Sequence, residues 1–288
     1  MRAPGLTLLI SAIAALALAG CGNGGNADMS ADEHAERMAV EHAGDEPIAN
    51  PMSSPEGELA SQGETVVYAT VDDTAVEGFL ARPADWKPGG PALIVIHEWW
   101  GLNDNIRTMA RRLADEGYLS LAVDLYGGQR ADTPERAREL MQAVNEDAAL
   151  DNLGQAYTYL TEEEGAGNVG SIGWCFGGGW SLQTALLLPD QLDAAVIYYG
   201  RLVTDTDRLA TLQMPILGHF GEADQGIPVD QVRLFEQALE KVGADATIDI
   251  YPGAGHAFAN PSGHNYQADA AELSWQRTVA FLNETLKQ

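Results

Sequence analysis

A single cysteine stands where the local pattern would expose a nucleophile. Gly173-Trp174-Cys175-Phe176-Gly177 falls where an apolar, strand-like stretch gives way to a helical pattern. Glycines two positions to either side of Cys175 permit a turn too tight for side chains, and such a turn lifts the nucleophile toward a helix N-terminus. That helix end stabilises a thiolate. The string predicts a nucleophile elbow carrying sulfur, while the further Gly178 and Gly179 keep a phosphate-binding turn as an alternative.

A carboxylate and a histidine follow, each just past a predicted strand. Asp224 comes first and His256 second, so the chain order is nucleophile, acid, base. This order is typical of α/β-hydrolases and differs from that of chymotrypsin-like and subtilisin-like proteases. His256 would accept or hold the thiol proton, and Asp224 would fix the tautomer of its ring. Glu222 is an alternative acid, and His219, inside its strand, is expected to be a core residue.

The elements that must position these residues alternate along the chain. An antiparallel opening pair precedes continuous apolar runs, which are typical of strands covered on both faces. We therefore expect an α/β-hydrolase fold, with a mostly parallel sheet of about eight strands and helices on both faces. Strands are predicted at residues 65–71, 76–82, 92–96, 119–124, 168–174, 194–199, 215–220 and 247–251, and helices at 104–116, 133–149, 151–163, from 176 and at 265–286.

One further string makes the pattern specific, because His97-Glu98 follows the first buried strand directly. With it, residues 65–286 resemble the dienelactone hydrolase (carboxymethylenebutenolidase) family. The matching motifs are His97-Glu98, Asp124-Leu125-Tyr126, Gly173 to Gly177 with cysteine, Asp224 and Gly255-His256-Ala257-Phe258.

This resemblance implies a mechanism. Glu98 would hold the resting thiol in an unreactive arrangement until substrate binds. Cys175 would then attack an ester or lactone carbonyl and form an acyl-thioester that water hydrolyses. The backbone N–H groups of Trp99 and Phe176 would form the oxyanion hole.

The sequence departs from the family at the arginines that bind a substrate carboxylate. Gly127-Gly128-Gln129 and Ala259-Asn260-Pro261 occupy those places, and only Arg130 is near enough to replace one of them. A neutral ester or lactone is therefore the expected small-molecule substrate. Candidate pocket residues are Trp99, Trp100, Tyr126, Arg130, Trp174 and Phe258.

Two other functions are weighed against a hydrolase. An inactive binding or scaffold protein could keep the same fold, since fold alone does not define activity. A thiol redox protein is disfavoured because no second cysteine is placed to resolve an oxidised Cys175. No metal or organic cofactor is expected, since no dinucleotide-binding glycine pattern follows the first parallel strand.

The N-terminal region reads as an export and anchoring segment. Residues 1–20 are predicted to be a signal peptide that ends in a string resembling a bacterial lipobox, with Cys21 as the lipidated residue. Residues 21–63 are predicted to be a flexible acidic tether, in which Ser30 could cap a short helix. His34, His42, Met29, Met38 and Met52 lie there without a recognised metal-ligand spacing. Residues 64–288 form the predicted hydrolase domain.

The formal net charge limits the kinds of binding partner that are expected. With 16 basic and 42 acidic residues, the formal net charge is −26, which disfavours nucleic acid and anionic membrane surfaces as partners. The expected contact with a membrane is through the lipid, on the outer membrane facing the periplasm, and a monomer is expected.

Overall fold

The computed structural model describes residues 29–45 and 59–287, and the predicted signal peptide, residues 1–20, and Cys21 lie outside them. Its centre is an eight-stranded sheet in the order β1-β2-β4-β3-β5-β6-β7-β8. The pairs β1–β2 and β2–β4 are antiparallel and the remaining pairs are parallel, as predicted. The strands are β1 (Gly63–Val71), β2 (Thr74–Ala81), β3 (Ala92–Ile96), β4 (Leu119–Val123), β5 (Val169–Trp174), β6 (Ala194–Tyr198), β7 (Ile216–Gly221) and β8 (Ala246–Tyr251).

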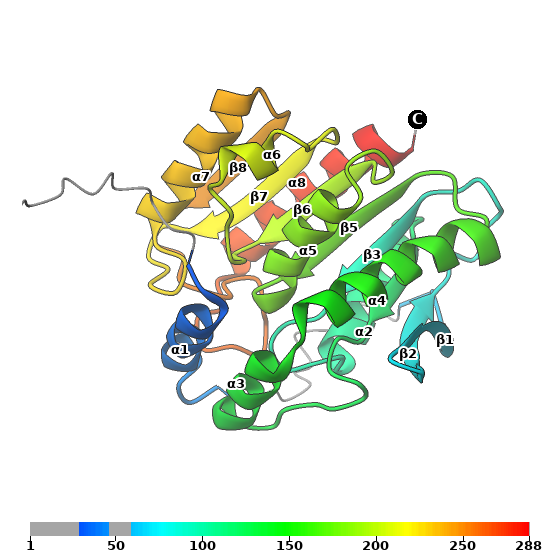
Figure 1. Cartoon of the computed structure of the whole chain (residues 1–288), viewed down its shortest axis with the longest axis horizontal. Helices are drawn as coiled ribbons and strands as arrows, with labels where there is room; N and C mark the ends of the chain where they lie inside the picture. The colour runs from blue at the N-terminus through cyan, green and yellow to red at the C-terminus, as the bar shows by residue number, and fades with distance from the viewer. Residues whose placement is uncertain (1–28, 46–58, 288) are drawn as a thin grey trace, which may run out of the picture.

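Helices cover both faces of the sheet, and each face has its own apolar core (Figure 1). On one face lie α2 (Asp104–Asp115) and α8 (Ala268–Leu286), and on the other lie α4 (Glu146–Thr158), α5 (Phe176–Leu187) and α7 (Val229–Val242). The central strands β3 to β6 are buried along their whole length, which explains why β3 and β6 carry no hydrophilic residue. This is an α/β-hydrolase fold. No helix in the described part of the chain is long and apolar enough to cross a membrane.

The helical region after β4 differs from the prediction of one helix over residues 133–149. Helix α3 (Pro134–Ala143) ends before Val144, whose backbone is extended. Asn145 then caps α4 through its side-chain oxygen, which accepts a hydrogen bond from the Ala148 N–H at 2.9 Å. A good N-cap residue thus divides an otherwise continuous helical pattern. The structure also adds the short π-helical segment η2 (Tyr159–Glu163) and the short helix α6 (Thr206–Leu209).

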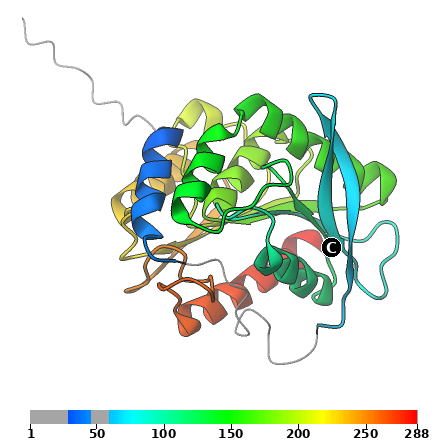
Figure 2. The same ribbon diagram turned by 90° about the horizontal axis from the view of Figure 1, so that it is seen from below.

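Part of the region predicted to be a flexible tether is folded against the domain. Helix α1 (Ala31–Glu41) begins at Ser30, whose hydroxyl oxygen accepts a hydrogen bond from the Glu33 N–H at 3.2 Å, as the capping pattern predicts. It lies beside α3, as both views show (Figures 1 and 2). Because Met38 of this helix contacts Cys175, just past the end of β5, α1 covers the carboxyl edge of the sheet. The sequence composition gave no indication of this packing.

Candidate active site

Cys175 occupies a sharp turn between β5 and α5. Its backbone has φ 55° and ψ −116°, a conformation that is strained for a residue with a side chain. A Cβ on Gly173 would lie 2.1 Å from the carbonyl oxygen of Gly177, and a Cβ on Gly177 would lie 2.3 Å from that of Ile96. Neither position therefore accepts a side chain, and the glycine spacing has the geometric cause that the sequence suggests.

His256 and Asp224 form a buried pair beside this turn. His256 Nδ1 lies 2.8 Å from Asp224 Oδ2. The other carboxylate oxygen, Oδ1, accepts hydrogen bonds from the N–H groups of Gly226 and Ile227, both at 2.8 Å. Glu222, the alternative acid, is exposed and instead accepts a hydrogen bond from a backbone N–H of a nearby loop. The structure therefore places Asp224, and not Glu222, behind the imidazole.

The sulfur of Cys175 and the ring of His256 are adjacent. A ring nitrogen of His256 lies within 4.8 Å of the sulfur, and Nδ1 is already engaged by Asp224, so the nitrogen facing the sulfur is Nε2. Burial by itself would raise the pKa of the Cys175 thiol, but the positive charge of His256 and the hydrogen bond and charge of His42 bring it to about 6. Although burial lowers the pKa of His256, the charges of Asp224 and Cys175 raise it well above its usual value. The pair therefore favours thiolate and imidazolium at neutral pH.

Glu98 is buried near the same centre. Its Oε2 accepts a hydrogen bond from Asn260 Nδ2 at 2.7 Å, while its Oε1 has no partner among the described residues. Burial, and then the negative charge of Cys175, raise the pKa of Glu98 to about 8. At neutral pH this carboxyl group is therefore mostly protonated. Among the described residues, the sulfur contacts Met38 and His42 and faces the ring of His256, and it makes no hydrogen bond to Glu98.

The two backbone donors expected for an oxyanion hole flank the nucleophile. Phe176 is the first residue of α5, so its N–H has no partner within the helix. Trp99 follows β3, the strand that pairs with β5. Within the described chain, neither N–H donates to a backbone carbonyl of another element. Neither donor is therefore occupied by backbone of the described chain, and their role as an oxyanion hole stays a prediction.

Side chains at the end of α1 cover the Cys175 sulfur. Met38 is fully buried, and its Sδ lies 3.6 Å from Cys175 Sγ. His42, just after the helix, places Nε2 3.8 Å from the same sulfur. Cys175 has no exposed surface. In this arrangement Met38 and His42 therefore help to cover the sulfur.

His42 is held in place from two directions. Its Nδ1 lies 2.8 Å from Asp45 Oδ2, and its ring stacks on Trp99 with the ring centroids 4.5 Å apart. Asp45 Oδ1 in turn accepts hydrogen bonds from the backbone and ring of His264, at 3.0 and 2.6 Å. The end of α1 is therefore tied to the loop that follows the catalytic histidine.

The sequence analysis did not predict that α1 packs over Cys175. Its buried side chains include His34, Met38 and His42, which recur every four residues and so share one face of the helix. Val40, between them, is 74% exposed. This spacing is the signal that could have indicated docking, although it could not have identified the surface on which the helix docks.

The predicted pocket residues fall into three groups. Trp99 and Trp100 contact His42 and so border the covered site. Trp174 packs against Tyr198, and Phe258 packs against Tyr199 and Tyr251, so both belong to the aromatic core beside it. Arg130 is exposed on the loop after β4. Trp174 and Phe258 share the buried cluster that contains Cys175, and their role in substrate binding stays a prediction, as does that of Arg130.

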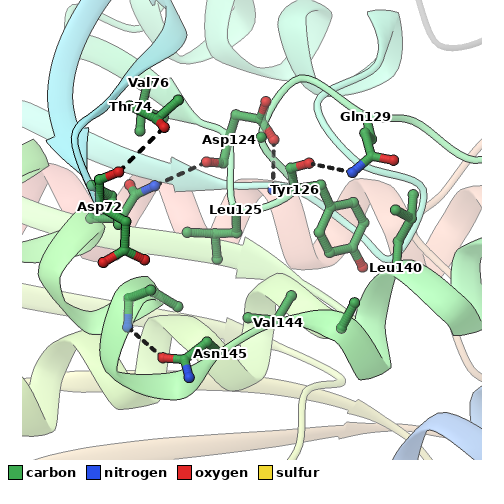
Figure 3. A pocket seen from close by; sticks show the side chains of 16 residues that line it. Asp72, Thr74, Val76, Asp124, Leu125, Tyr126, Gln129, Leu140, Val144 and Asn145 are labelled. Carbon is green, nitrogen blue, oxygen red and sulfur yellow. Dashed lines mark hydrogen bonds between the residues drawn. The ribbon is translucent and has the colours of Figure 1, made fainter.

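Tyr126 belongs to a neighbouring cavity (Figure 3). This cavity, of about 310 Å³, lies between the β1–β2 turn, the loop after β4 and the start of α4. Neither Cys175 nor His256 lines it. The ring of Tyr126 nevertheless contacts Phe176, with the centroids 5.3 Å apart, so one side chain borders both the cavity and the elbow.

The fold and the site together define an α/β-hydrolase whose elbow carries a cysteine beside a histidine–aspartate pair. The sequence model of the Dienelactone hydrolase family matches residues 76–286. The chain belongs to the dienelactone hydrolase family and is a carboxylic ester or lactone hydrolase.

Similar proteins agree with this assignment. A protein named "Putative carboxymethylenebutenolidase" from Saccharolobus solfataricus is 31% identical over 78% of this chain and 100% of its own length. "Protein usf" from Aquifex pyrophilus is 34% identical over 73% of this chain and 94% of its own. A crystal structure described as a "Putative Dienelactone Hydrolase" from Klebsiella pneumoniae is 31% identical, covers 77% of this chain and 98% of its own, and has a TM-score of 0.70.

Proposed function

We propose that the protein hydrolyses a neutral ester or lactone through Cys175 and an acyl-thioester intermediate. The observation that carries this proposal is the position of the Cys175 sulfur at the elbow, within 4.8 Å of a ring nitrogen of His256 whose Nδ1 is bound to Asp224. This arrangement places the nucleophile beside its base and the base beside the carboxylate that orients it, as covalent catalysis requires.

The chemistry runs in two halves. The thiolate attacks the carbonyl carbon, and the N–H groups of Trp99 and Phe176 donate to the resulting oxyanion. As the intermediate collapses, the bond to the leaving alkoxide breaks and the His256 imidazolium gives the alkoxide a proton. Neutral His256 then takes a proton from water, whose oxygen attacks the thioester and releases the carboxylic acid. Each oxyanion donor contributes about 3 to 4 kcal/mol in comparable sites.

Substrate binding requires α1 to leave first. The resemblance to the family assigns protection of the resting thiol to Glu98, and in this chain Met38 and His42 also cover the sulfur. Protonated Glu98 would remain close by, and its charge state would respond to formation of the thiolate, since the negative charge of Cys175 raises its pKa.

The preference for a neutral substrate rests on charge. The chain has a net charge of −26, and Arg130, the only replacement for the family arginines, lies exposed on its loop. Comparing kcat/KM for a carboxylated lactone and its methyl ester tests this point. A clear preference for the free acid would contradict it.

The mechanism is tested by replacing the nucleophile. Cys175→Ala should abolish ester hydrolysis while leaving the circular dichroism spectrum unchanged. A brief reaction of the wild type with an activated ester should add one acyl group, located by mass spectrometry on Cys175. Unchanged activity in Cys175→Ala, or an acyl group on another residue, would refute the mechanism.

We further propose that Cys21 carries a lipid and holds the protein on the periplasmic side of the outer membrane. The support is the lipobox-like string that ends residues 1–20. Cys21→Ser should move the protein from the membrane fraction to the soluble fraction. If the distribution is unchanged, the anchor lies elsewhere.

A further inference from the structure

Four side-chain atoms that can bind a metal ion converge where the end of α1 meets Cys175 and His256. One ligand atom each from His42, Cys175 and His256 lie within 4.8 Å of one another, and all three residues are buried. The thioether sulfur of Met38 adds a fourth soft atom, 3.6 Å from the Cys175 sulfur. Hydrolysis needs Cys175 and His256, but the proposed mechanism gives His42 and Met38 no chemical role.

The two imidazoles are arranged as metal-ligating histidines usually are. His42 Nδ1 is bound by Asp45 and His256 Nδ1 by Asp224, each at 2.8 Å. A carboxylate on one ring nitrogen fixes the tautomer and makes the other nitrogen a better metal ligand. Both Nε2 atoms are thereby directed toward the sulfur.

An unsatisfied polar atom points into the same space. His256 Nε2 is buried and has no hydrogen-bond partner among the described residues, and His256 is only 1% exposed. Such an atom usually requires a ligand, an ion or water. It is the nitrogen that faces the Cys175 sulfur, so the histidine–aspartate pair directs a ligand atom into this space.

The distances suit a small ion. With metal–sulfur and metal–nitrogen bonds of about 2.3 and 2.0 Å, tetrahedral geometry places the two ligand atoms about 3.5 Å apart. His42 Nε2 is already 3.8 Å from the sulfur. The longest allowed separation, 4.8 Å, would need to shorten by about 1.3 Å.

We propose that His42, Cys175 and His256, with Met38 as a weaker fourth ligand, bind a copper(I) ion and lock the site closed. Thiolate and thioether sulfurs select soft ions, and two histidines, a cysteine and a methionine form a ligand set found in copper proteins. On binding, the proton that the Cys175–His256 pair holds on the imidazolium leaves to solvent, which frees His256 Nε2 as a ligand, and the copper keeps its oxidation state. Because the ion joins α1 to the catalytic pair, the bound form is closed to substrate.

The binding test uses the full-length chain carrying Cys21→Ser, which removes the only other cysteine. Cobalt(II) serves as the spectroscopic probe, and copper(I) is measured in competition with a coloured chelator. One equivalent of cobalt should give a thiolate-to-metal charge-transfer band. His42→Ala should abolish the band, and Asp45→Asn should weaken copper binding about 10- to 100-fold.

His34→Leu is the matched control. His34 is a second buried histidine on the same helix, and its ring nitrogens have no hydrogen-bond partner in the described chain, so an apolar residue can replace it. This variant should bind copper as the parent does. Loss of binding in His34→Leu but not in His42→Ala would overturn the proposal, as would the absence of a thiolate band in the parent.

The link to hydrolysis is tested separately. Copper should inhibit the parent enzyme, and in Asp45→Asn the concentration for half-inhibition should rise about tenfold or more. Metal binding does not require Cys175 to be the nucleophile. If Cys175→Ala loses the cobalt band yet retains full esterase activity, the hydrolytic mechanism fails and the metal site stands.

Discussion

Truncating Met38 should activate the enzyme. Its side chain is fully buried and covers the Cys175 sulfur at 3.6 Å, so it stabilises the closed arrangement in which substrate has no access. Burying a methionine side chain is worth about 1.5 to 3 kcal/mol. If Met38→Ala destabilises the closed form by about 2 kcal/mol, and each 1.36 kcal/mol is a factor of ten, the open fraction rises roughly 30-fold.

Two rates report this change. The kcat/KM for a neutral aryl ester and the rate of Cys175 alkylation by iodoacetamide should both rise, by up to about 30-fold if the wild type is mostly closed. Val40→Ala is the control, because Val40 lies on the same helix but is 74% exposed, and both rates should stay within about twofold. If Met38→Ala folds normally and both rates are unchanged or lower, then α1 does not limit access to the sulfur.

Three further predictions concern the ionisable groups of the site. Asp224→Asn should lower kcat by on the order of 10³- to 10⁴-fold, because the tautomer of His256 is no longer fixed, whereas exposed Glu222→Gln should change it little; equal effects would contradict the assignment. Because the thiol pKa is lowered to about 6, kcat/KM should fall only below about pH 6, and an acid limb near the ordinary thiol value of about 8.5 would be inconsistent with an ion pair. Glu98 has its pKa raised to about 8 in the fold, so its favourable contribution to stability is complete below about pH 4.5 and is lost as the pH rises toward 8. Urea unfolding from pH 5 to 8 should show that Glu98→Gln removes this loss, which is on the order of a few kcal/mol, and parallel pH profiles for the variant and wild type would disprove it.

The sequence by itself determined the sheet and the order of the catalytic groups. Short continuous apolar runs are typical of strands that are covered on both faces, and the runs at residues 92–96 and 194–198 correspond to β3 and β6. The glycines around Cys175 were equally informative, because a Cβ at Gly173 or Gly177 would collide with backbone. The constraint on Gly173 acts within the turn itself, against Gly177, while the constraint on Gly177 comes from the neighbouring strand β3, and the glycine pattern of the sequence records both.

Only the tertiary structure decided what lies over the sulfur. A helix as short as α1 has little stability of its own, so whether it forms depends on the surface it meets. That surface is built from Cys175, Trp99 and the loop that carries His256, which are far apart in the sequence. The choice of Asp224 over Glu222, the lowered pKa of the thiol and the convergence of His42 on it have the same origin, since burial and charge at a site depend on side chains brought together by the complete fold.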